Sequence, residues 1–454
     1  MNNANHTWTL SQVAQAVNGE RFGDDVHFSG VSTDSRSIGA GELFVALVGP
    51  NFNGNEFVSH AASRGAAAVV VSEQVNTPLP GVVVNDTRIA LGLLASAWRD
   101  QFSYPVIAIT GSNGKTTVKE MMASIMRCEK NTLATRGNLN NDFGVPLTLL
   151  RMTAAHEAAI IEMGANHHGE IKYLTEMAKP NVALITNAGP AHLEGFGDLK
   201  GVSRAKGEIY SGLSSSGTAI INADDQFADY WRSLNTDRKV LTFGLKQPAD
   251  VTASYETTLL TTKLSMRTPA GTVSVDLPMP GEHSVLNALA ATAACIAAGA
   301  SLDSVKAGLE NLQKVSGRFQ VRKGKAGSRI IDDTYNANPA SLKAALDVLR
   351  NMPGHHFLAI GDMGELGNNA EQMHRDAGRQ AKDSGVNRLY AIGKYARFIT
   401  QSFGKDAEEF NDHVSMISAI NDELNPDVTL LVKGSRLMHM EKVVDALVAN
   451  GENQ

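Results

Sequence analysis

Short apolar runs alternate with Ala-rich stretches along most of the chain from Leu43 onward. The unbroken apolar runs indicate strands buried on both faces, and the stretches between them have the apolar spacing of amphipathic helices. Strands are predicted at Leu43–Val48, Ala67–Val71, Gly81–Val84, Val106–Thr110, Ala158–Ile161, Val182–Thr186, Ala219–Asn222, Arg329–Asp332, Phe357–Ile360, Arg388–Ile392 and Thr429–Val432. Helices are predicted at Asn55–Arg64, Ile89–Arg99 and Val118–Arg127. This alternation predicts an α/β fold with mainly parallel sheets.

Two segments depart from this alternation. Val251–Asp276 is rich in Thr, Ser and Val with alternating polar positions, which predicts antiparallel hairpins. Residues 317–328 contain a Gly-rich, basic segment of the kind that is typical of a junction between domains. A chain of 454 residues is also too long for one core. We therefore predict three domains, which comprise residues 1–88, 89–316 and 317–454.

Composition and charge exclude several classes of protein. The apolar fraction of 43% is that of a folded chain, and 41 basic against 47 acidic residues give a net charge of −6, which argues against binding to nucleic acid or to an anionic membrane. The two cysteines, Cys128 and Cys295, are too few for a disulfide framework or a Cys-rich zinc site. The N-terminus has no signal peptide, and the apolar run Ala288–Ala300 is too short to span a membrane. A soluble cytoplasmic protein is expected.

A glycine-rich segment, Gly-Ser-Asn-Gly-Lys-Thr-Thr, directly follows the predicted strand Val106–Thr110. Glycines let the backbone fold around phosphate, Lys115 can reach the β- and γ-phosphates of a nucleotide, and the Thr116 hydroxyl can hold Mg²⁺. The general phosphate-binding loop has a glycine where this chain has Ile109, so the loop that starts at Gly111 is a compact variant. The segment predicts a nucleotide site.

Three further residues are candidates for this chemistry. Glu162 follows the predicted strand Ala158–Ile161, where an acid that holds the metal of a phosphate-binding loop is expected. His192 comes after another predicted strand, and its position fits a second metal ligand and a capping histidine equally well. Lys206 lies in a predicted helix, and by its sequence context alone it is a solvated surface lysine.

Together these segments resemble the Mur ligases of peptidoglycan synthesis, and the resemblance runs nearly from end to end. The segments that carry it are Thr110–Thr117, Gly137–Pro146, Glu162–Asn166, Ala191–Phe196, Ala205–Glu208, Gly281–Asn287, Ser316–Arg318, Asp332–Pro339 and Val432–Arg436. The resemblance implies an N-terminal domain for a UDP-linked substrate, a central ATPase domain and a C-terminal Rossmann-like domain. It is strongest to the family members that join D-alanyl-D-alanine to UDP-N-acetylmuramoyl-tripeptide with ATP and Mg²⁺, through an acyl phosphate. A monomer is expected.

The resemblance also implies roles for individual residues. The nucleotide would be bound by Gly111, Ser112, Asn113, Gly114, Lys115, Thr116, Thr117, Asn138, Asn287, Arg318 and Asp333. Thr116 and Glu162 would hold one Mg²⁺, Glu162 and His192 would help to hold a second, and a carbamylated Lys206 would be a further metal ligand. Catalysis would depend on Lys115, Lys206 and His192. The uridine diphosphate end would meet Ser32, Ser35 and Arg36, and the peptide end would meet Asn336, Asn338, Lys433, Ser435 and Arg436.

Three alternatives differ from this interpretation in testable ways. A folylpolyglutamate synthase shares the compact loop but lacks the N-terminal domain, whereas about a hundred residues precede the loop here. The diaminopimelate-adding ligase of the same family carries an Asp-Asn-Pro-Arg motif, which this chain does not contain. A nucleotide-switched binding protein would have a guanine-reading motif such as Asn-Lys-x-Asp, and that motif is also missing.

Overall fold

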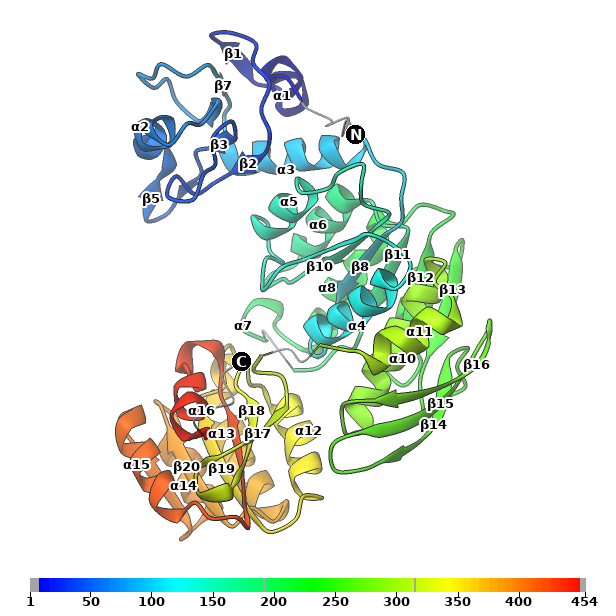
Figure 1. Cartoon of the computed structure of the whole chain (residues 1–454), viewed down its shortest axis with the longest axis vertical. Coiled ribbons are helices and arrows are strands. Elements are labelled where there is room, and N and C mark those ends of the chain that lie inside the picture. Colours follow the sequence, from blue (N-terminus) through cyan, green and yellow to red (C-terminus); the bar gives the residue numbers. More distant parts are fainter. Residues whose placement is uncertain (1–7, 191–192, 314–315, 450–454) are drawn as a thin grey trace.

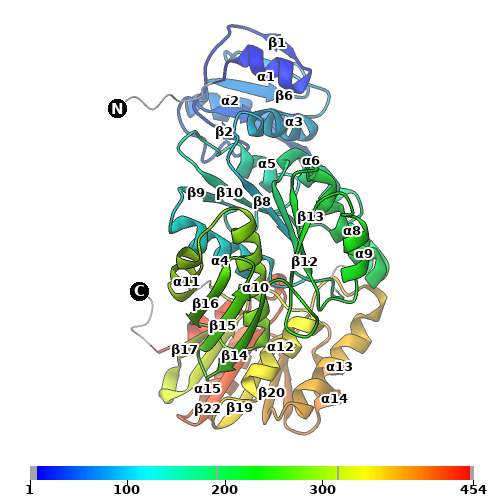
Figure 2. The ribbon, with the colours of Figure 1, turned by 90° about the vertical axis from the view of Figure 1, so that its right-hand side faces the viewer.

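The computed structural model describes residues 8–190, 193–313 and 316–449. Three parts follow one another along the long axis of the molecule: an N-terminal sheet at one end, a central sheet in the middle and a C-terminal sheet at the other end (Figure 1). The view from the side shows the same order (Figure 2). None of the helices within these residues is long and apolar enough to cross a membrane.

The N-terminal sheet has the strand order β1-β7-β6-β3-β2, with β1 antiparallel to β7 and the other neighbours parallel. Its elements are α1 (Leu10–Val17), β1 (Glu20–Phe22), β2 (Val31–Ser32), β3 (Leu43–Val45), a separate hairpin of β4 (Val48–Gly49) and β5 (Phe52–Asn53), η1 (Gly54–Phe57), α2 (Val58–Ser63), β6 (Ala68–Val71), β7 (Gly81–Val83) and α3 (Thr87–Arg99). Leu43 and Val70 of the sheet pack in one core with Leu10 of α1 and Leu91 of α3.

The central sheet is parallel throughout, with the order β13-β12-β11-β8-β10-β9. Its elements are β8 (Val106–Thr110), α4 (Lys115–Arg127), β9 (Thr132–Ala134), α5 (Gly144–Leu149), β10 (Ala158–Glu162), α6 (Glu170–Ala178), β11 (Val182–Ile185), α7 (Leu193–Phe196), α8 (Leu199–Gly207), η2 (Glu208–Gly212), β12 (Thr218–Asn222), α9 (Ala228–Ser233), β13 (Lys239–Phe243), α10 (Glu282–Ala297) and α11 (Leu302–Glu310). Helices α4, α10 and α11 share a core with one face of the sheet, and α6 and α8 share a core with the other face.

A small antiparallel sheet extends from the central part, formed by β14 (Thr252–Thr257), β15 (Thr262–Thr268) and β16 (Gly271–Leu277). Alternate residues of β15 are buried, and Leu264 and Met266 pack in the same core as α10. The alternation of polar and apolar positions along Val251–Asp276 therefore predicted this sheet correctly.

The C-terminal sheet has the order β17-β18-β22-β19-β20-β21, in which β17 is antiparallel to β18 and the other pairs are parallel. Its elements are β17 (Gln320–Lys323), η3 (Lys325–Gly327), β18 (Arg329–Asp333), α12 (Pro339–Leu349), β19 (His355–Gly361), η4 (Gly367–Asn369), α13 (Ala370–Asp383), β20 (Arg388–Ile392), α14 (Ala396–Phe403), β21 (Ala407–Phe410), α15 (His413–Glu423), β22 (Val428–Lys433), η5 (Arg436–Met438) and α16 (Glu441–Leu447). Helices α12, α13 and α14 share a core with one face, and α15 and α16 share a core with the other.

The α/β fold with mainly parallel sheets is confirmed. Some local predictions were wrong. The helix predicted at Asn55–Arg64 is a 3-10 turn followed by the short helix α2, and the strand predicted at Leu43–Val48 is divided into β3 and β4. Helices α3 and α4 begin two and three residues before their predicted starts at Ile89 and Val118. Helix α3 crosses the predicted boundary at residue 88, since its Leu91 packs in the N-terminal core and its Ala95 in a core of the central sheet. The domain boundaries stay a prediction.

Candidate active site

A cavity of about 1090 Å³ lies between the carboxyl ends of the central strands and the loops of the C-terminal sheet. The residues predicted from the sequence that line it are Ser112, Asn113, Gly114, Lys115, Thr116, Thr117, Asn138, Glu162, Asn287, Arg318, Asp333, Asn336, Asn338, Lys433 and Arg436. Residues from segments more than 200 positions apart are thus brought together at one site. Open parallel sheets bind ligands at this edge because the loops after the strands and the helix N-termini converge there.

The loop between β8 and α4 contains two glycines with backbone conformations that disfavour other residues, with φ of +151° at Gly111 and +81° at Gly114. A Cβ atom on Gly111 would lie 1.8 Å from Oγ1 of Thr186, and one on Gly114 would lie 2.6 Å from Oδ1 of Asn287. Because the backbone itself forms this wall, and α4 begins directly after it at Lys115, free N–H groups line the cavity. A loop of this kind is suited to hold a phosphate group.

Lys115 is held at the inner surface of this loop. Its Nζ donates a hydrogen bond of 2.7 Å to the backbone oxygen of Gly111. Burial lowers the pKa of the Lys115 ammonium, the carboxylates of Glu162 and Glu365 act in the opposite direction, and the positive charge of Arg318 lowers it further. A negatively charged ligand in the cavity would stabilise the charged form of this side chain.

Glu162 is the last residue of β10, and it is only 1% exposed. Oε1 accepts hydrogen bonds from Nδ2 of Asn140 at 2.8 Å and from Oγ1 of Thr116 at 3.3 Å. The backbone N–H of Glu162 donates to Oγ1 of Thr135 at 3.0 Å. Oε2 is buried and has no hydrogen-bond partner among the described residues. A buried carboxylate oxygen that lacks a hydrogen-bond partner is suited to bind a cation.

Lys206 is buried in α8, contrary to the surface position that its sequence context suggested, and it is 1% exposed. Its Nζ lies 5.4 Å from the ring centroid of Phe196, and within the described residues it forms no hydrogen bond or ion pair. Burial lowers the pKa of Lys206 to about 7, the nearby charge of Lys115 lowers it too, and Glu208 and Glu170 oppose the shift. Because burial disfavours the charged form, the uncharged amine of Lys206 is more populated at neutral pH than that of an exposed lysine.

Arg318 connects the two halves of the cavity. Its Nη2 donates a hydrogen bond of 3.1 Å to Oγ1 of Thr116, and its guanidinium lies 3.9 Å from the ring centroid of Tyr335. An arginine stacked on an aromatic ring is held in one orientation and remains charged. Arg318 therefore reaches from the start of the C-terminal part to the phosphate-binding loop.

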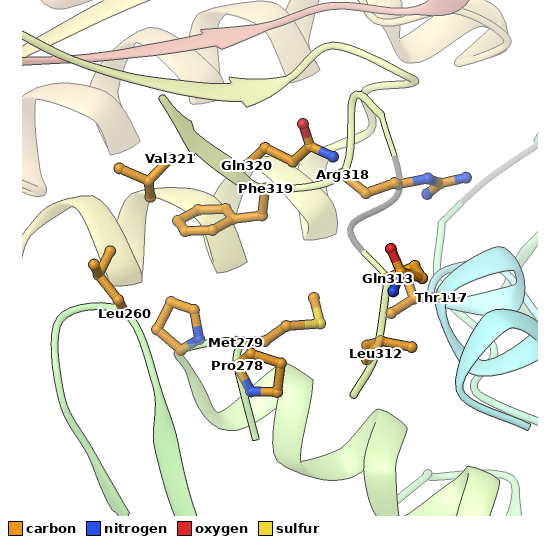
Figure 3. Close-up of a pocket in the computed structure, with 11 residues that line it drawn as sticks. Thr117, Leu260, Pro278, Met279, Leu312, Gln313, Arg318, Phe319, Gln320 and Val321 are labelled. Atoms are coloured by element: carbon orange, nitrogen blue, oxygen red, sulfur yellow. The ribbon is translucent and has the colours of Figure 1, made fainter. Parts of the chain in front are cut away.

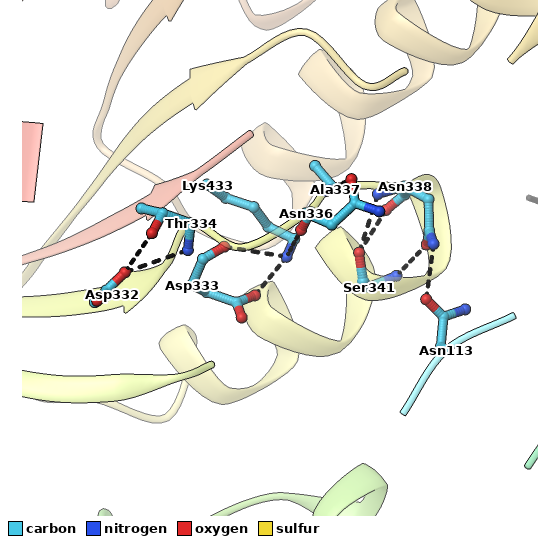
Figure 4. A network of polar contacts seen from close by, with 9 residues as sticks. All are labelled: Asn113, Asp332, Asp333, Thr334, Asn336, Ala337, Asn338, Ser341 and Lys433. Carbon is cyan, nitrogen blue, oxygen red and sulfur yellow. Dashed lines mark hydrogen bonds and ion pairs between the residues drawn. The ribbon is translucent and has the colours of Figure 1, made fainter. Parts of the chain in front are cut away.

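An ion pair organises the segment after β18 (Figure 4). Nζ of Lys433, a residue only 1% exposed, lies 2.5 Å from Oδ2 of Asp333 and donates a hydrogen bond of 2.9 Å to the backbone oxygen of Asn336. One buried ammonium thus holds the segment that carries both Asp333 and Asn336 at the cavity wall.

Asn338 joins this segment to the phosphate-binding loop (Figure 4). Its Oδ1 accepts a hydrogen bond of 2.9 Å from the N–H of Ser341, which caps α12, and its Nδ2 donates one of 2.7 Å to Oδ1 of Asn113. The two ends of one amide therefore serve two purposes, a helix cap and a contact between the central and C-terminal parts.

The remaining predicted residues lie elsewhere. The guanidinium of Arg36 forms a bidentate pair with Asp34, with distances of 2.9 and 2.8 Å, and this interaction lowers the pKa of Asp34 to about 2. Ser32 bonds the backbone of Asp34, and Ser35 contacts Nδ1 of His60 at 3.1 Å. These residues belong to the N-terminal part and do not line the cavity. Gly111, Lys206 and Ser435 adjoin the cavity without lining it, and His192 lies outside the described residues.

A second, smaller pocket of about 130 Å³ lies beside the segment that enters the C-terminal part (Figure 3). Its lining residues come from the hairpin sheet and from both sides of the junction: Thr117, Leu260, Pro278, Met279, Pro280, Leu312, Gln313, Arg318, Phe319, Gln320 and Val321. The pocket is mainly apolar, and Phe319 in its wall has a left-handed backbone with a φ of +50°.

Sequence reasoning missed residues that support the site. Asn140 and Thr135 hold Glu162, Tyr335 orients Arg318, and His283 lines the cavity with its ring centroid 6.2 Å from that of Phe319. Burial lowers the pKa of His283, so its imidazole is neutral at pH 7. Asn140, His283 and Tyr335 all fall inside segments that carried the resemblance, which was the available signal.

Family models match most of the chain. The Mur ligase middle domain matches residues 109–295, the glutamate ligase domain of Mur ligases matches residues 317–436, and the Mur ligase family catalytic domain matches residues 27–127. The three matched ranges include the phosphate-binding loop, Glu162, Lys206 and the segments after β18 and β22 that line the cavity.

Individual relatives cover nearly the whole length. UDP-N-acetylmuramoyl-tripeptide--D-alanyl-D-alanine ligase of Escherichia coli is 45% identical over 98% of this chain and 99% of its own, and that of Bacillus subtilis is 33% identical over 97% and 98%. A crystal structure of MurF from Acinetobacter baumannii superimposes with a TM-score of 0.92 at 37% identity, covering 97% of this chain and 98% of that chain. MurF ligase from Thermotoga maritima in complex with ADP gives 0.81 at 27% identity, covering 92% and 96%.

Proposed function

The chain belongs to the Mur ligase family, and from this membership and the cavity we propose that it is an ATP-dependent ligase that adds D-alanyl-D-alanine to UDP-N-acetylmuramoyl-tripeptide. The product is the UDP-linked pentapeptide precursor of peptidoglycan, made in the cytoplasm. The observation that carries the proposal is the convergence of phosphate-binding loop, buried carboxylate and C-terminal loops on one cavity, in a chain 45% identical to such a ligase over 98% of its length.

The residues present fit ATP. The glycine cradle at Gly111 and Gly114 would receive the phosphates, with the Lys115 ammonium beside them. Asn138 and Asn287 would meet the base, and Asp333 and Arg318 would reach the ribose and phosphates from the C-terminal part. Because these groups come from both parts, nucleotide binding would favour their close approach.

The residues also fit Mg²⁺. The buried, unpartnered Oε2 of Glu162 and the neighbouring hydroxyl of Thr116 are oxygen ligands of the kind that Mg²⁺ prefers. Bound there, the ion would supply positive charge to the phosphate oxygens and so favour phosphoryl transfer. Asn140 would keep the Glu162 carboxylate in place through its hydrogen bond to Oε1, and Thr135 fixes the Glu162 backbone by accepting a hydrogen bond from its N–H.

The reaction needs ATP because a carboxylate is a poor electrophile and peptide-bond formation in water is unfavourable. The terminal carboxylate of the UDP-linked tripeptide attacks the γ-phosphorus of ATP, the bond from this phosphorus to the bridging oxygen breaks, and ADP leaves. Lys115 and Arg318 compensate the negative charge on the transferred phosphoryl group. The amine of D-alanyl-D-alanine then attacks the resulting acyl phosphate, and phosphate leaves. The contact of Asn338 with Asn113 closes the cavity on one side and helps to exclude water, which would hydrolyse the acyl phosphate.

We propose that Lys206 acts as a carbamylated metal ligand, and its lowered pKa supports this role. Only an unprotonated amine adds carbon dioxide, and burial lowers the pKa of Lys206 to about 7, so a reactive fraction exists at neutral pH. The carbamate that forms is an anion, and it would convert a buried cation that repels Mg²⁺ into a metal ligand. On the resemblance alone, His192 is proposed to help Glu162 hold a second Mg²⁺.

The two ends of the substrate are assigned to different parts of the molecule. Ser32, Ser35 and Arg36 are proposed to meet the uridine diphosphate at the N-terminal part. Asn336, Asn338, Lys433, Ser435 and Arg436 are proposed to line the peptide end, and four of these five border the cavity.

Phosphate release tests the assignment. The purified chain is incubated with ATP, Mg²⁺ and UDP-N-acetylmuramoyl-tripeptide, with and without D-alanyl-D-alanine. Release that depends on both substrates, with a product heavier by the dipeptide, is expected. Tripeptides ending in diaminopimelate and in lysine identify the accepted third residue. Phosphate release that requires glutamate or a diamino acid in place of the dipeptide would identify the chain as a different ligase of this family.

A further inference from the structure

Glu365 is an acidic residue of the cavity wall to which neither the motifs nor the proposed mechanism gives a role. It lies in the loop between β19 and η4, on the C-terminal side of the cavity, and it borders the cavity itself. Its φ of +61° places the backbone in the left-handed region, which glycine adopts readily and a glutamate does not. Strained residues of this kind concentrate at functional sites.

The surrounding structure imposes this conformation. On the N-terminal side of Glu365, the backbone N–H of Met363 donates to Nε2 of His374 at 2.9 Å, and the His374 ring stacks on Tyr395 at 4.5 Å between centroids. The carboxylate of Asp362 accepts hydrogen bonds from the N–H groups of Lys394 at 2.8 Å and Tyr395 at 3.0 Å. Met363 and Leu366 are both 2% exposed. Residues on both sides of Glu365 are therefore anchored, by hydrogen bonds at Asp362 and Met363 and by burial at Leu366.

The position of Glu365 relates it to two cations. Its negative charge acts on Lys115 of the phosphate-binding loop, across the cavity. On its own side, the Glu365 loop adjoins the loop of Arg436: the N–H of Ser435 donates to the backbone oxygen of Asp362 at 2.9 Å, and a Cβ on Gly364 would lie 3.6 Å from the Ser435 side chain. Glu365 and Arg436 thus border the cavity from adjoining loops with opposite charges, and Nη1 of Arg436 also lies 3.5 Å from Oε1 of Glu441.

D-Alanyl-D-alanine is a zwitterion, with an ammonium at one end and a carboxylate at the other at pH 7. We propose that Glu365 binds the ammonium group of the incoming dipeptide, while Arg436 faces its carboxylate. The inference rests on the proposed function, and it adds the residue that recognises the attacking nitrogen. A carboxylate opposite Lys115 would hold this nitrogen on the side of the cavity that faces the phosphate-binding loop, where the acyl phosphate forms.

The test compares two ligands in wild type and Glu365→Gln. The first is D-alanyl-D-alanine, and the second is N-propanoyl-D-alanine, which has the same shape without the ammonium and serves as a competitive inhibitor. Glu365→Gln should raise the KM for D-alanyl-D-alanine about 10- to 100-fold, which is the effect of losing a hydrogen bond to a charged group. The inhibition constant of N-propanoyl-D-alanine, and the KM values for ATP and the UDP-linked tripeptide, should stay within about twofold.

Two further variants separate binding from folding. Glu365→Gly removes the carboxylate and suits the left-handed backbone, so it should show the same KM defect and melt no lower than Glu365→Gln. Glu371→Gln, on the exposed face of α13 where Glu371 pairs with Arg375 at 3.0 Å, is the matched control and should behave as wild type. An unchanged KM for the dipeptide in Glu365→Gln, or an equal rise for all three substrates, would overturn the inference. The proposed function fails separately, if wild type itself shows no release dependent on D-alanyl-D-alanine.

Discussion

Asn338 of α12 donates a hydrogen bond of 2.7 Å to Asn113 of the phosphate-binding loop, although 225 positions separate the two residues in the sequence. The same Asn338 side chain caps α12 through its other end, so helix stability and the contact between parts depend on one amide. The position of the C-terminal part relative to ATP is therefore coupled to a helix cap.

Asn338→Ser should keep the cap of α12 and remove the contact with Asn113. Serine retains a capping oxygen but is too short to reach Asn113, so we expect wild-type thermal stability and a KM for ATP raised about fivefold. Asn338→Ala should show the same KM and also lose about 1 kcal/mol of unfolding free energy. Ser301→Ala, which removes the cap of α11 away from the cavity, should lower stability alone. A wild-type KM in Asn338→Ser would show that the contact is unimportant.

Lys115→Ala should abolish ADP formation, with turnover reduced by at least about 10²-fold, because the charge that compensates the transferred phosphoryl group is lost. The measurement is the steady-state rate of ADP release with all substrates present. Lys172→Ala is a suitable control, since Lys172 is exposed and pairs with Glu176 at 3.8 Å. Turnover near that of wild type would contradict the role of Lys115 at the phosphates.

Glu162→Gln should remove the response of the protein to Mg²⁺ without weakening the fold. A buried carboxylate oxygen without a partner carries an uncompensated desolvation cost, so the neutral amide should leave the melting temperature of the metal-free protein unchanged or higher. The stabilisation that wild type gains from Mg²⁺ together with ATP should disappear, and Glu176→Gln should keep it. A variant that melts lower without metal and still responds to Mg²⁺ would refute this assignment.

Lys206→Ala should lose most activity, and short carboxylic acids such as acetate or propionate should restore part of it. The added acid would occupy the space of the missing side chain and supply an anionic oxygen where the carbamate is proposed. The measurement is the rate of phosphate release as a function of added acid, with wild type as the control for general salt effects. Absence of any rescue would leave the carbamate unsupported.

The lowered pKa of Lys206 also predicts how stability depends on pH. Between about pH 7 and pH 10.5 the unfolded state binds a proton at this lysine that the folded state does not bind, so unfolding free energy should rise with pH across this range. Below about pH 7 both states are charged, and the full cost of burying the cation remains. In wild type this rise in unfolding free energy should be on the order of a few kcal/mol, and Lys206→Met should not show it. Denaturant titrations of both proteins at several pH values, in metal-free and carbonate-free buffer, give the comparison.

Local patterns predicted the parts of the molecule that depend on neighbouring residues. The buried strand Val106–Thr110 has the predicted bounds, and the loop after it is one contiguous segment whose chemistry is legible in its sequence. The start of α4 was placed too late because Gly114, in a left-handed conformation, precedes the helix in place of a capping Ser, Thr, Asp or Asn.

Contacts between distant segments were beyond such patterns. Asn140 bonds Glu162 because the loop after β9 folds over the end of β10, and neither segment alone indicates the pairing. Lys206 has the sequence context of a surface lysine, but α8 packs against the central sheet with this position inward. The left-handed backbone of Glu365 had no signal either, since the contacts that surround its loop join residues as far apart as Asp362 and Tyr395, which are 33 positions apart.

The glycine cradle has a consequence for the evolution of drug resistance. Every substitution of Gly111 or Gly114 adds at least a Cβ, which would approach Thr186 to 1.8 Å or Asn287 to 2.6 Å on a backbone already disfavoured for other residues. An inhibitor that draws its affinity from the backbone of these two positions would therefore meet few substitutions there that the fold tolerates. Escape would have to come from elsewhere in the chain, or from the amount of protein made.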